Sequence, residues 1–169
     1  MRISFADLHR GAVEKKWRLE TPAEVLGTLP VTVGSLDIEV SARGTPRDGV
    51  RVEGRLSAIA RCECRRCLDE VRVEIAPALD VWFRVEDEVT PGEDGVWPFA
   101  RASDGIDLTD AVREEVLLAL PDYPVCEEEC RGICPSCGAR LSEEDCTCPP
   151  PEPDERWAAL REVNVRKGG

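Results

Sequence analysis

Six cysteines between residues 126 and 148 constrain this chain more than any other feature. Within them, Cys134–Gly138 reads Cys-Pro-Ser-Cys-Gly, the spacing of a zinc knuckle, in which two thiolates grip one tetrahedral ion and a glycine permits the tight turn beneath it. A second Cys-x-x-Cys pair lies upstream, at Cys64 and Cys67. So many thiols in a chain with a single histidine indicate either metal binding or disulfides.

The cellular compartment decides between metal and disulfides. The first residues contain no basic segment followed by an apolar run, and no stretch of the chain is long enough to span a bilayer. We therefore expect a cytoplasmic protein without a membrane partner, in a compartment where thiols stay reduced and clustered cysteines more often hold metal. The expected ion is Zn²⁺ in a structural role, because catalytic zinc needs an open position and usually histidine, and His9 is the only histidine.

The sequence leaves the choice of the four metal ligands partly open. Cys134 and Cys137 are expected in any site, and Cys146 with Cys148 is the favoured completion, because the intervening loop gives the chain room to return. In a second arrangement Cys126 and Cys130 complete the tetrahedron around the same knuckle. In a third, Cys64 and Cys67 join Cys134 and Cys137 and staple the C-terminal segment onto the sheet.

Charge limits the classes of partner. The formal net charge of −12 argues against binding nucleic acid through general phosphate attraction, which depends on clustered Lys and Arg. A local basic patch remains around the first cysteine group, where Arg61, Arg65 and Arg66 are candidate RNA contacts. An acidic surface usually serves only solubility, and where it binds a partner it favours a basic protein. No phosphate-cradling Gly-rich loop and no catalytic triad can be assembled, so we expect no enzymatic activity and no small-molecule substrate.

Hydrophobic periodicity predicts an α+β fold. Apolar and polar residues alternate over 36–43 and 50–58 on either side of a Pro/Asp-Gly turn, and again over 71–85, where Pro77 interrupts the run. Residues 108–120 carry an i, i+4 apolar stripe typical of a core helix, with Asp107 as its cap and Pro121 at its end. We expect an antiparallel sheet that could close into a barrel, one core helix, and a small zinc-ribbon-like C-terminal appendage.

Composition shifts divide the chain into three expected parts. Residues 1–122 form the α+β core domain, and residues 123–149 form the cysteine-rich zinc-binding segment. Residues 150–169 hold a Pro-rich linker followed by a short helix over 154–163.

Several motifs in this order resemble the YceD-type family of bacterial and chloroplast proteins. They are Cys-Arg-Arg-Cys-Leu at 64–68, Glu-Glu-Val-Leu-Leu-Ala-Leu-Pro at 114–121, the knuckle region 130–138 and Arg-Trp-Ala-Ala-Leu at 156–160. The resemblance covers about residues 35 to 163. One departure follows the knuckle, where the family typically reads Asn-Leu-Asn and residues 140–142 are Arg-Leu-Ser.

The resemblance implies a non-enzymatic role in the accumulation of large-subunit ribosomal RNA and in ribosome assembly. The implied partners are a ribosomal RNA precursor or a basic large-subunit ribosomal protein. Two other functions stay open from the residues alone. One is a cytosolic thiol oxidoreductase that uses Cys64 and Cys67. The other is a zinc-ribbon interaction module with no link to ribosomes.

Overall fold

The longest strand of the molecule, β5 (Val50–Glu63), organises the fold. Its buried apolar residues alternate with more exposed residues, mostly Arg, Glu and Ser, so one face packs inward and the other faces solvent. Its first half pairs with β4 (Leu36–Gly44) and β7 (Ala78–Val85), and its second half pairs with β3 (Thr32–Val33) and β6 (Glu70–Ile75). All four pairings are antiparallel, so β5 is the common partner of the sheet's other inner strands.

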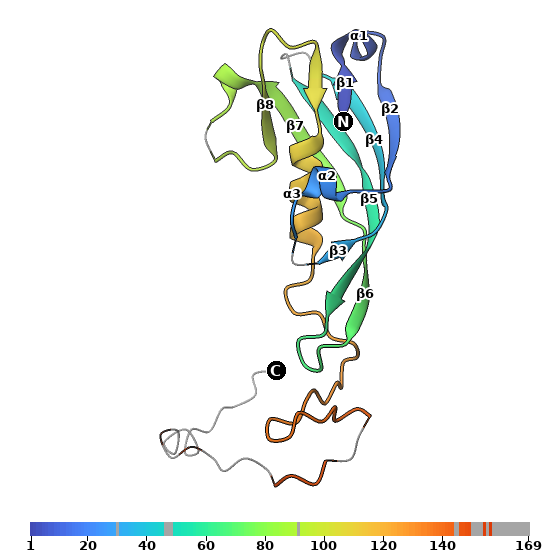
Figure 1. Ribbon diagram of the computed structural model, residues 1–169. Helices are drawn as coiled ribbons and strands as arrows, with labels where there is room; N and C mark the ends of the chain where they lie inside the picture. The colour runs from blue at the N-terminus through green and yellow to red at the C-terminus, as the bar shows by residue number, and fades with distance from the viewer. Residues whose placement is uncertain are drawn as a thin grey trace, which may run out of the picture.

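Two strands lie at the ends of the main strand order of this seven-stranded sheet. Strand β2 (Val13–Leu19) pairs antiparallel with β4, and β8 (Val96–Phe99) pairs parallel with β7. In the described part of the chain no ladder joins β2 to β8, so the sheet is open (Figure 1). The expected closure into a barrel is therefore wrong. Pro98 in β8 offers no N–H to a further strand, which suits an edge.

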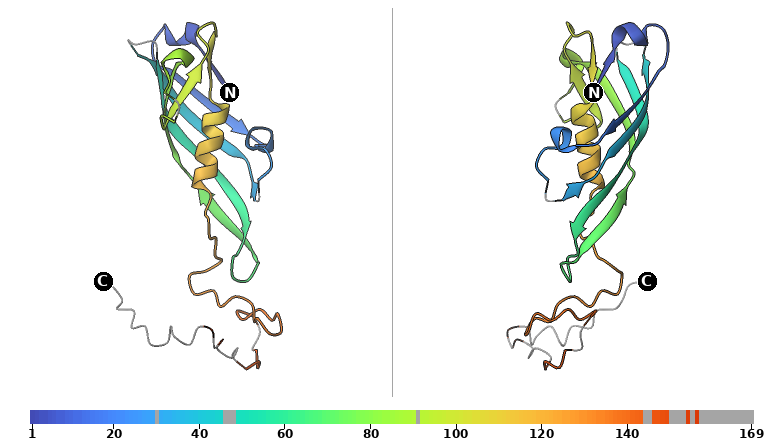
Figure 2. Two further views of the ribbon diagram at one scale, coloured as in Figure 1. Left: turned by 90° about the vertical axis from the view of Figure 1, so that its left-hand side faces the viewer. Right: turned by 45° about the vertical axis from the view of Figure 1, so that its right-hand side comes forward.

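One main helix covers the buried face of the sheet (Figure 2). Helix α3 (Thr109–Ala119) begins where the Asp107 carboxylate accepts a hydrogen bond from the Thr109 backbone N–H at 2.9 Å, and Pro121 follows its end. The α+β class with a mostly antiparallel sheet and one main helix is thus confirmed. The core joins the helix to the sheet through Val112, Val116, Leu36, Ile38, Val52, Leu56, Val81 and Phe83.

Shorter elements close the N-terminal end of the molecule. Strand β1 (Arg2–Ser4) pairs antiparallel with β9 (Gly105–Asp107) directly before α3. Helices α1 (Phe5–Leu8) and α2 (Ala23–Leu26) flank β2, and a single 3-10 turn, η1 (Glu86–Glu88), follows β7.

At the opposite end, β5 and β6 extend past the rest of the sheet as a hairpin whose tip is residues 64–69 (Figure 1). The cysteine-rich segment after α3 lies against this tip. Among residues 123–143 and 146–149, the only regular pairing is an isolated bridge between Ile133 and Arg140. The segment therefore has almost no backbone ladder of its own.

The computed structural model describes residues 1–29, 31–45, 49–90, 92–143 and 146–149, together with Asp154 and Arg156. The short helix expected over 154–163 lies outside the described residues apart from those two positions. The three-part division of the chain stays a prediction. No helix within the described ranges combines the length and apolar character needed to cross a bilayer.

Candidate metal centres

The two Cys-x-x-Cys turns share one backbone conformation. In each turn the carbonyl of the first cysteine, Cys64 or Cys134, accepts from the N–H four residues on, at 3.0 and 2.9 Å. Its own N–H donates to the carbonyl five residues on, at 2.8 Å in both. The residue after the second cysteine takes a left-handed conformation, with φ of 65° at Leu68 and 77° at Gly138. Both turns therefore have the form of a zinc knuckle.

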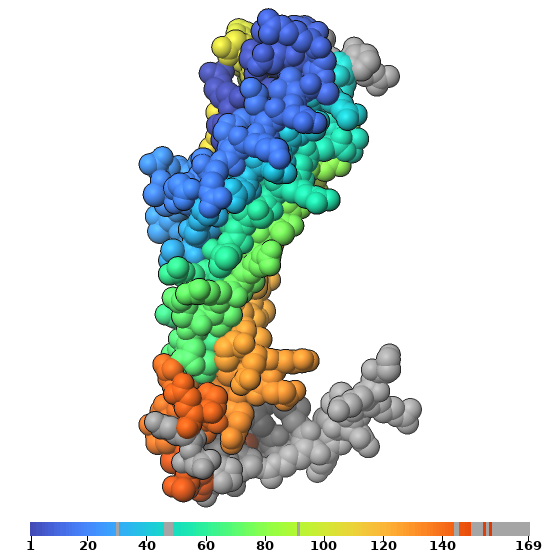
Figure 3. All heavy atoms as spheres, turned by 90° about the vertical axis from the view of Figure 1, so that its right-hand side faces the viewer, coloured from blue at the N-terminus to red at the C-terminus, as the bar shows by residue number. Residues whose placement is uncertain are grey.

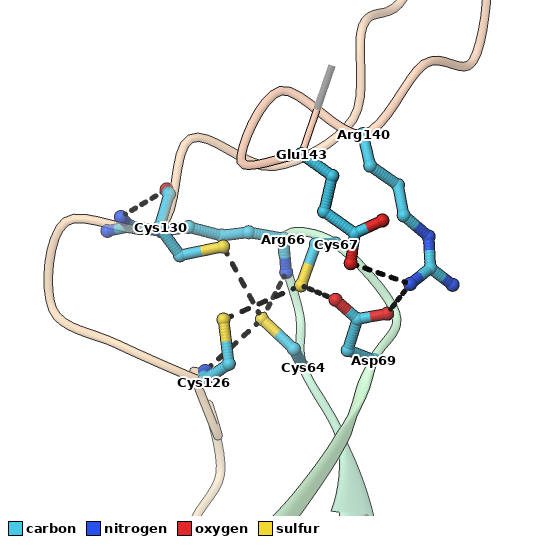
Figure 4. Close-up of polar contacts among 8 residues, drawn as sticks. All are labelled: Cys64, Arg66, Cys67, Asp69, Cys126, Cys130, Arg140 and Glu143. Atoms are coloured by element: carbon cyan, nitrogen blue, oxygen red, sulfur yellow. Dashed lines mark hydrogen bonds and ion pairs between the residues drawn. The ribbon is translucent and has the colours of Figure 1, made fainter.

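The first knuckle meets two cysteines from the segment after α3. The sulfur atoms of Cys64, Cys67, Cys126 and Cys130 lie within 4.8 Å of one another, and we call this set the proximal cluster (Figure 4). Cys64 and Cys130 are 3.8 Å apart at sulfur, and Cys67 and Cys126 are 3.6 Å apart. Three of the four side chains are buried, with Cys126 the exposed one. The cluster thus joins the hairpin tip to a part of the chain about 60 residues later.

The second knuckle is completed locally. The sulfur atoms of Cys134, Cys137, Cys146 and Cys148 also lie within 4.8 Å of one another, and we call this set the distal cluster. Cys146 lies 3.3 Å from Cys134 and 3.6 Å from Cys137 at sulfur. This cluster is more exposed than the proximal one, since only Cys134 is buried.

The sulfur separations fit a tetrahedral metal ion better than disulfides. Four thiolates at about 2.3 Å from a central Zn²⁺ are about 3.8 Å from one another, whereas a disulfide joins sulfurs at about 2.05 Å. The measured contacts of 3.3–3.8 Å cluster near the first value, and all nine cysteines are free. Each cluster could therefore hold one metal ion with four thiol ligands and no ligand position left over.

Backbone N–H groups favour the thiolate form of the first cysteine in each knuckle. The N–H of Cys67 lowers the pKa of Cys64 to about 6, helped by the N–H groups of Arg66 and Cys126. The N–H groups of Cys137 and Ser136 lower the pKa of Cys134 to about 6 in the same way. Such N–H···S hydrogen bonds stabilise a metal-bound thiolate and orient it.

In each cluster a neighbouring thiol, Cys126 or Cys148, has a raised pKa and so keeps its proton more firmly. Hydrogen bonding to Cys146 and Cys137 raises the pKa of Cys148 to about 12. The pKa of Cys126 is also raised, first through its contact with Cys130. A cation at the cluster centre stabilises the thiolate form, so metal binding displaces these protons.

Arg66 fixes the proximal cluster from the hairpin side. Its guanidinium donates to the backbone carbonyls of Glu128 at 3.1 Å and Cys130 at 2.9 Å. Gly132, with φ of 75°, lies against the Arg66 backbone, and a Cβ at that position would come within 3.0 Å of the Arg66 carbonyl oxygen. A positively charged donor and a glycine thus allow the two chain segments to approach closely.

An ion pair connects the two clusters. Arg140, which follows the second knuckle, pairs with the carboxylate of Asp69 in the hairpin tip (Figure 4). Asp69 also accepts from the Cys67 thiol at 3.2 Å, so the pair lies directly beside the proximal sulfurs. The hairpin tip therefore contacts the cysteine-rich segment in two places, through the sulfurs of Cys126 and Cys130 and through the ion pair with Arg140.

The structure brings together the favoured ligand set and regroups the alternatives. Cys134, Cys137, Cys146 and Cys148 form one cluster, as the preferred arrangement requires. Cys126 and Cys130 do not complete that knuckle, and Cys64 and Cys67 do not join it. These four residues instead form the proximal cluster, a combination that sequence reasoning missed. Eight cysteines in four closely spaced pairs were the available signal, since they suffice for two complete sites.

The three candidate RNA-binding arginines have different environments. Arg66 is held by the carbonyls of the cysteine segment. Arg65 lies over the Tyr123 ring, with its guanidinium carbon 5.8 Å from the ring centre. Arg61 is exposed on β5 directly opposite Arg72 on β6. Two like charges in register are unfavourable in a sheet, and the carboxylate of Glu70, 3.8 Å from Arg72, offsets part of this repulsion.

Fold and site together define a class of protein: an open α+β sheet whose longest hairpin is joined to a C-terminal segment by one four-cysteine cluster, with a second such cluster inside that segment. The sequence profile of the family described as "Large ribosomal RNA subunit accumulation protein YceD" matches residues 52–164. That range contains the hairpin, α3 and both clusters. The chain belongs to the YceD family.

Curated relatives agree with this assignment. An uncharacterized protein of Mycobacterium tuberculosis is 33% identical over 169 residues, covering 96% of this chain and 81% of the relative. The Arabidopsis thaliana protein named "Large ribosomal RNA subunit accumulation protein YCED homolog 1, chloroplastic" is 25% identical over 150 residues, covering 71% of this chain and 47% of that protein. The Zea mays protein of the same name is 26% identical over 153 residues, covering 73% of this chain and 51% of that protein. No solved structure matches the chain at a significant level.

Proposed function

We propose that this protein is a non-enzymatic cytoplasmic factor that supports the accumulation of large-subunit ribosomal RNA and ribosome assembly. The observation that carries the proposal is the family match over residues 52–164, together with the names of the two plant relatives. The matched range includes every described feature of the cysteine end of the molecule. We therefore look for the activity there.

We assign Zn²⁺ to both clusters in a structural role. Four thiolates fill the tetrahedral positions of zinc and leave none for water or substrate. The cysteine-rich segment has little regular structure, and its local core consists of the buried side chains of Cys64, Cys67 and Cys130 with a few partly buried neighbours. In such a segment the free energy of metal binding takes the place of a hydrophobic core.

The burial of the first knuckle supports a non-enzymatic role. A dithiol oxidoreductase needs an attacking thiolate that its substrate can reach. The side chains of Cys64 and Cys67 are 0% and 1% exposed, and each is in contact with a further cysteine. This arrangement favours metal binding over thiol exchange.

The arginines of the hairpin are the proposed contacts to ribosomal RNA. Arg61 and Arg72 form a cationic pair on the exposed side of the hairpin, and Arg65 lies beside Tyr123 at the tip. A phosphate between Arg61 and Arg72 would relieve their mutual repulsion. Arg66 is exposed, but its guanidinium donates hydrogen bonds to backbone carbonyls of the cysteine-rich segment and is therefore not a proposed RNA contact. A basic ribosomal protein of the large subunit is the second proposed partner, on grounds of charge.

The test is genetic complementation. In a strain that lacks its own copy of the gene, we expect the ratio of large- to small-subunit ribosomal RNA to fall and to be restored by the wild-type protein. Arg61→Glu combined with Arg72→Glu should restore it poorly, because the phosphate contacts are reversed in charge. Arg55→Glu is the control, since Arg55 is exposed on the same strand but outside the hairpin. An unchanged ribosomal RNA ratio in the deletion strain would overturn the proposal.

A further inference from the structure

Exposed apolar side chains gather near the end of α3. Within the described residues only five large hydrophobic side chains are exposed, and three of them, Leu117, Leu118 and Tyr123, fall within seven residues. Leu118 and Tyr123 are 73% and 80% exposed. Single exposed leucines are ordinary on protein surfaces, but a cluster of this kind indicates a contact surface.

These side chains continue the outward face of the helix. Asp110, Glu114 and Leu117 follow one another at i, i+4 and i+7 and are all exposed, whereas Val112 and Val116 on the opposite side are buried in the core. Leu118 borders the exposed stripe. Figure 3 shows the segment that follows α3 standing out from the body beside the hairpin. The exposed stripe thus ends at Leu117, shortly before the projecting segment that carries Asp122 and Tyr123.

The same region carries more than half of the net negative charge of the protein. Residues 107–129 contain eight carboxylates and one guanidinium, a formal charge of −7 out of −12 for the whole chain. In the part of the chain that the structure describes, the carboxylates of Asp110, Glu114 and Asp122 have no ion-pair partner. The surface is thus acidic and apolar at the same time.

We propose that Asp110, Glu114, Leu117, Leu118, Asp122 and Tyr123 form a docking surface for a basic polypeptide segment that carries apolar side chains. The inference rests on the proposed function for its class of partner and adds the surface that the partner occupies. Lys or Arg side chains of the segment would pair with the three free carboxylates, while its apolar side chains cover the two leucines and the tyrosine.

Charge selects this occupant over two others. RNA would bring phosphates against a surface with a formal charge of −7, which is repulsive. A second copy of the chain, related by a two-fold axis, would place the same carboxylates against each other. The hairpin arginines and the α3 surface therefore have opposite preferences. The two surfaces meet where Arg65 lies over one side of the Tyr123 ring, so the basic segment would cover the rest of that side chain.

The experiment measures binding of a synthetic 15-residue Lys/Leu peptide to the full-length, zinc-loaded protein by fluorescence anisotropy. The double variant Leu118→Ser/Tyr123→Ser should weaken binding about tenfold. The control is Ile59→Ser, which also removes an exposed apolar side chain, 53% exposed, but on the sheet. This control should leave peptide binding unchanged. Asp110→Asn with Glu114→Gln should weaken it by several-fold. Glu86→Gln with Asp87→Asn removes the same charge elsewhere and is the matched control.

Four outcomes would overturn the proposal. The first is equal binding by the Leu118/Tyr123 variant and by Ile59→Ser, which would mean general attraction to an acidic protein. The second is equally tight binding of a peptide with Ser in place of Leu. The third is a wild-type dimer in sedimentation that Leu118→Ser dissociates, which would assign the surface to a second copy. The fourth is a peptide that binds only the Trp157→Ser/Leu160→Ser variant and not the wild type, which would mean that the protein's own C-terminal segment occupies the surface. The ribosomal RNA ratio in the deletion strain is measured separately, so either idea can fail alone.

Discussion

Leu68 follows the second cysteine of the first knuckle, a position that Gly138 holds in the second knuckle. Leu68 has φ of 65° and is the one non-glycine residue with positive φ among the described positions, and its side chain is 59% exposed. Gly138 holds the same position in the second knuckle with φ of 77°. An L-residue in this region costs about 1–2 kcal/mol, which Gly avoids. The first knuckle thus carries backbone strain that its contacts with the cysteine-rich segment must offset.

Leu68→Gly should therefore stabilise the zinc-loaded protein by roughly 0.5–1 kcal/mol, after allowing for the greater freedom of Gly in the unfolded chain. The exposed leucine side chain contributes little packing that could be lost. Thermal unfolding would show a midpoint a few degrees higher. Gly138→Leu is the reciprocal variant, with open space around the glycine, and should lower stability through backbone strain alone. A lower midpoint for Leu68→Gly would mean that the leucine side chain makes a stabilising contact.

At the scale of elements, strands β4 to β7 and the main helix were predictable because each carries its own local pattern. The alternation over 36–43 and 50–58 became β4 and β5, and Pro77 separated β6 from β7 as expected. The parallel pairing of β8 was not predictable, since four residues carry no information about their partner strand. The grouping of Cys64 and Cys67 with Cys126 and Cys130 could not be predicted either, because nothing in the local sequence shows which distant cysteines they meet. It depends on how far β5 and β6 project beyond the end of α3, which is a property of the assembled sheet.

Removal of the zinc proposed for the two clusters should release the cysteine-rich segment from the hairpin tip without unfolding the sheet. The sheet–helix core contains no cysteine of either cluster, so it can persist when the thiols are protonated or the metal is chelated. After chelation we expect faster amide hydrogen exchange in residues 64–69 and 124–141. Strand β4 and helix α3 should keep their protection. Loss of protection across β4 would show instead that the metal clusters support the whole fold.

At the scale of the molecule, the end with α1 and the end with the cysteine clusters differ in structure and charge. The N-terminal end is an ordinary packed sheet and helix, whereas the cysteine end combines a projecting hairpin, two thiol clusters and opposite charges on neighbouring surfaces. The sequence was sufficient to predict the class of fold, which follows from hydrophobic periodicity, and the family, which follows from the order of its motifs along the chain. The separate roles of Arg61, Arg65 and Arg66 required the structure, since three nearby arginines look alike until their neighbours are known.

Zinc content measured by mass spectrometry under non-denaturing conditions tests the central claim most directly, namely that two separate clusters each bind one structural ion. The wild-type protein should carry two zinc ions per chain, matching the two four-cysteine groups. Cys64→Ser and Cys134→Ser should each carry one, because each change opens a different cluster, and Cys62→Ser should keep both, since Cys62 belongs to neither. A wild-type chain with one zinc or none, or loss of both ions from Cys134→Ser, would contradict the claim.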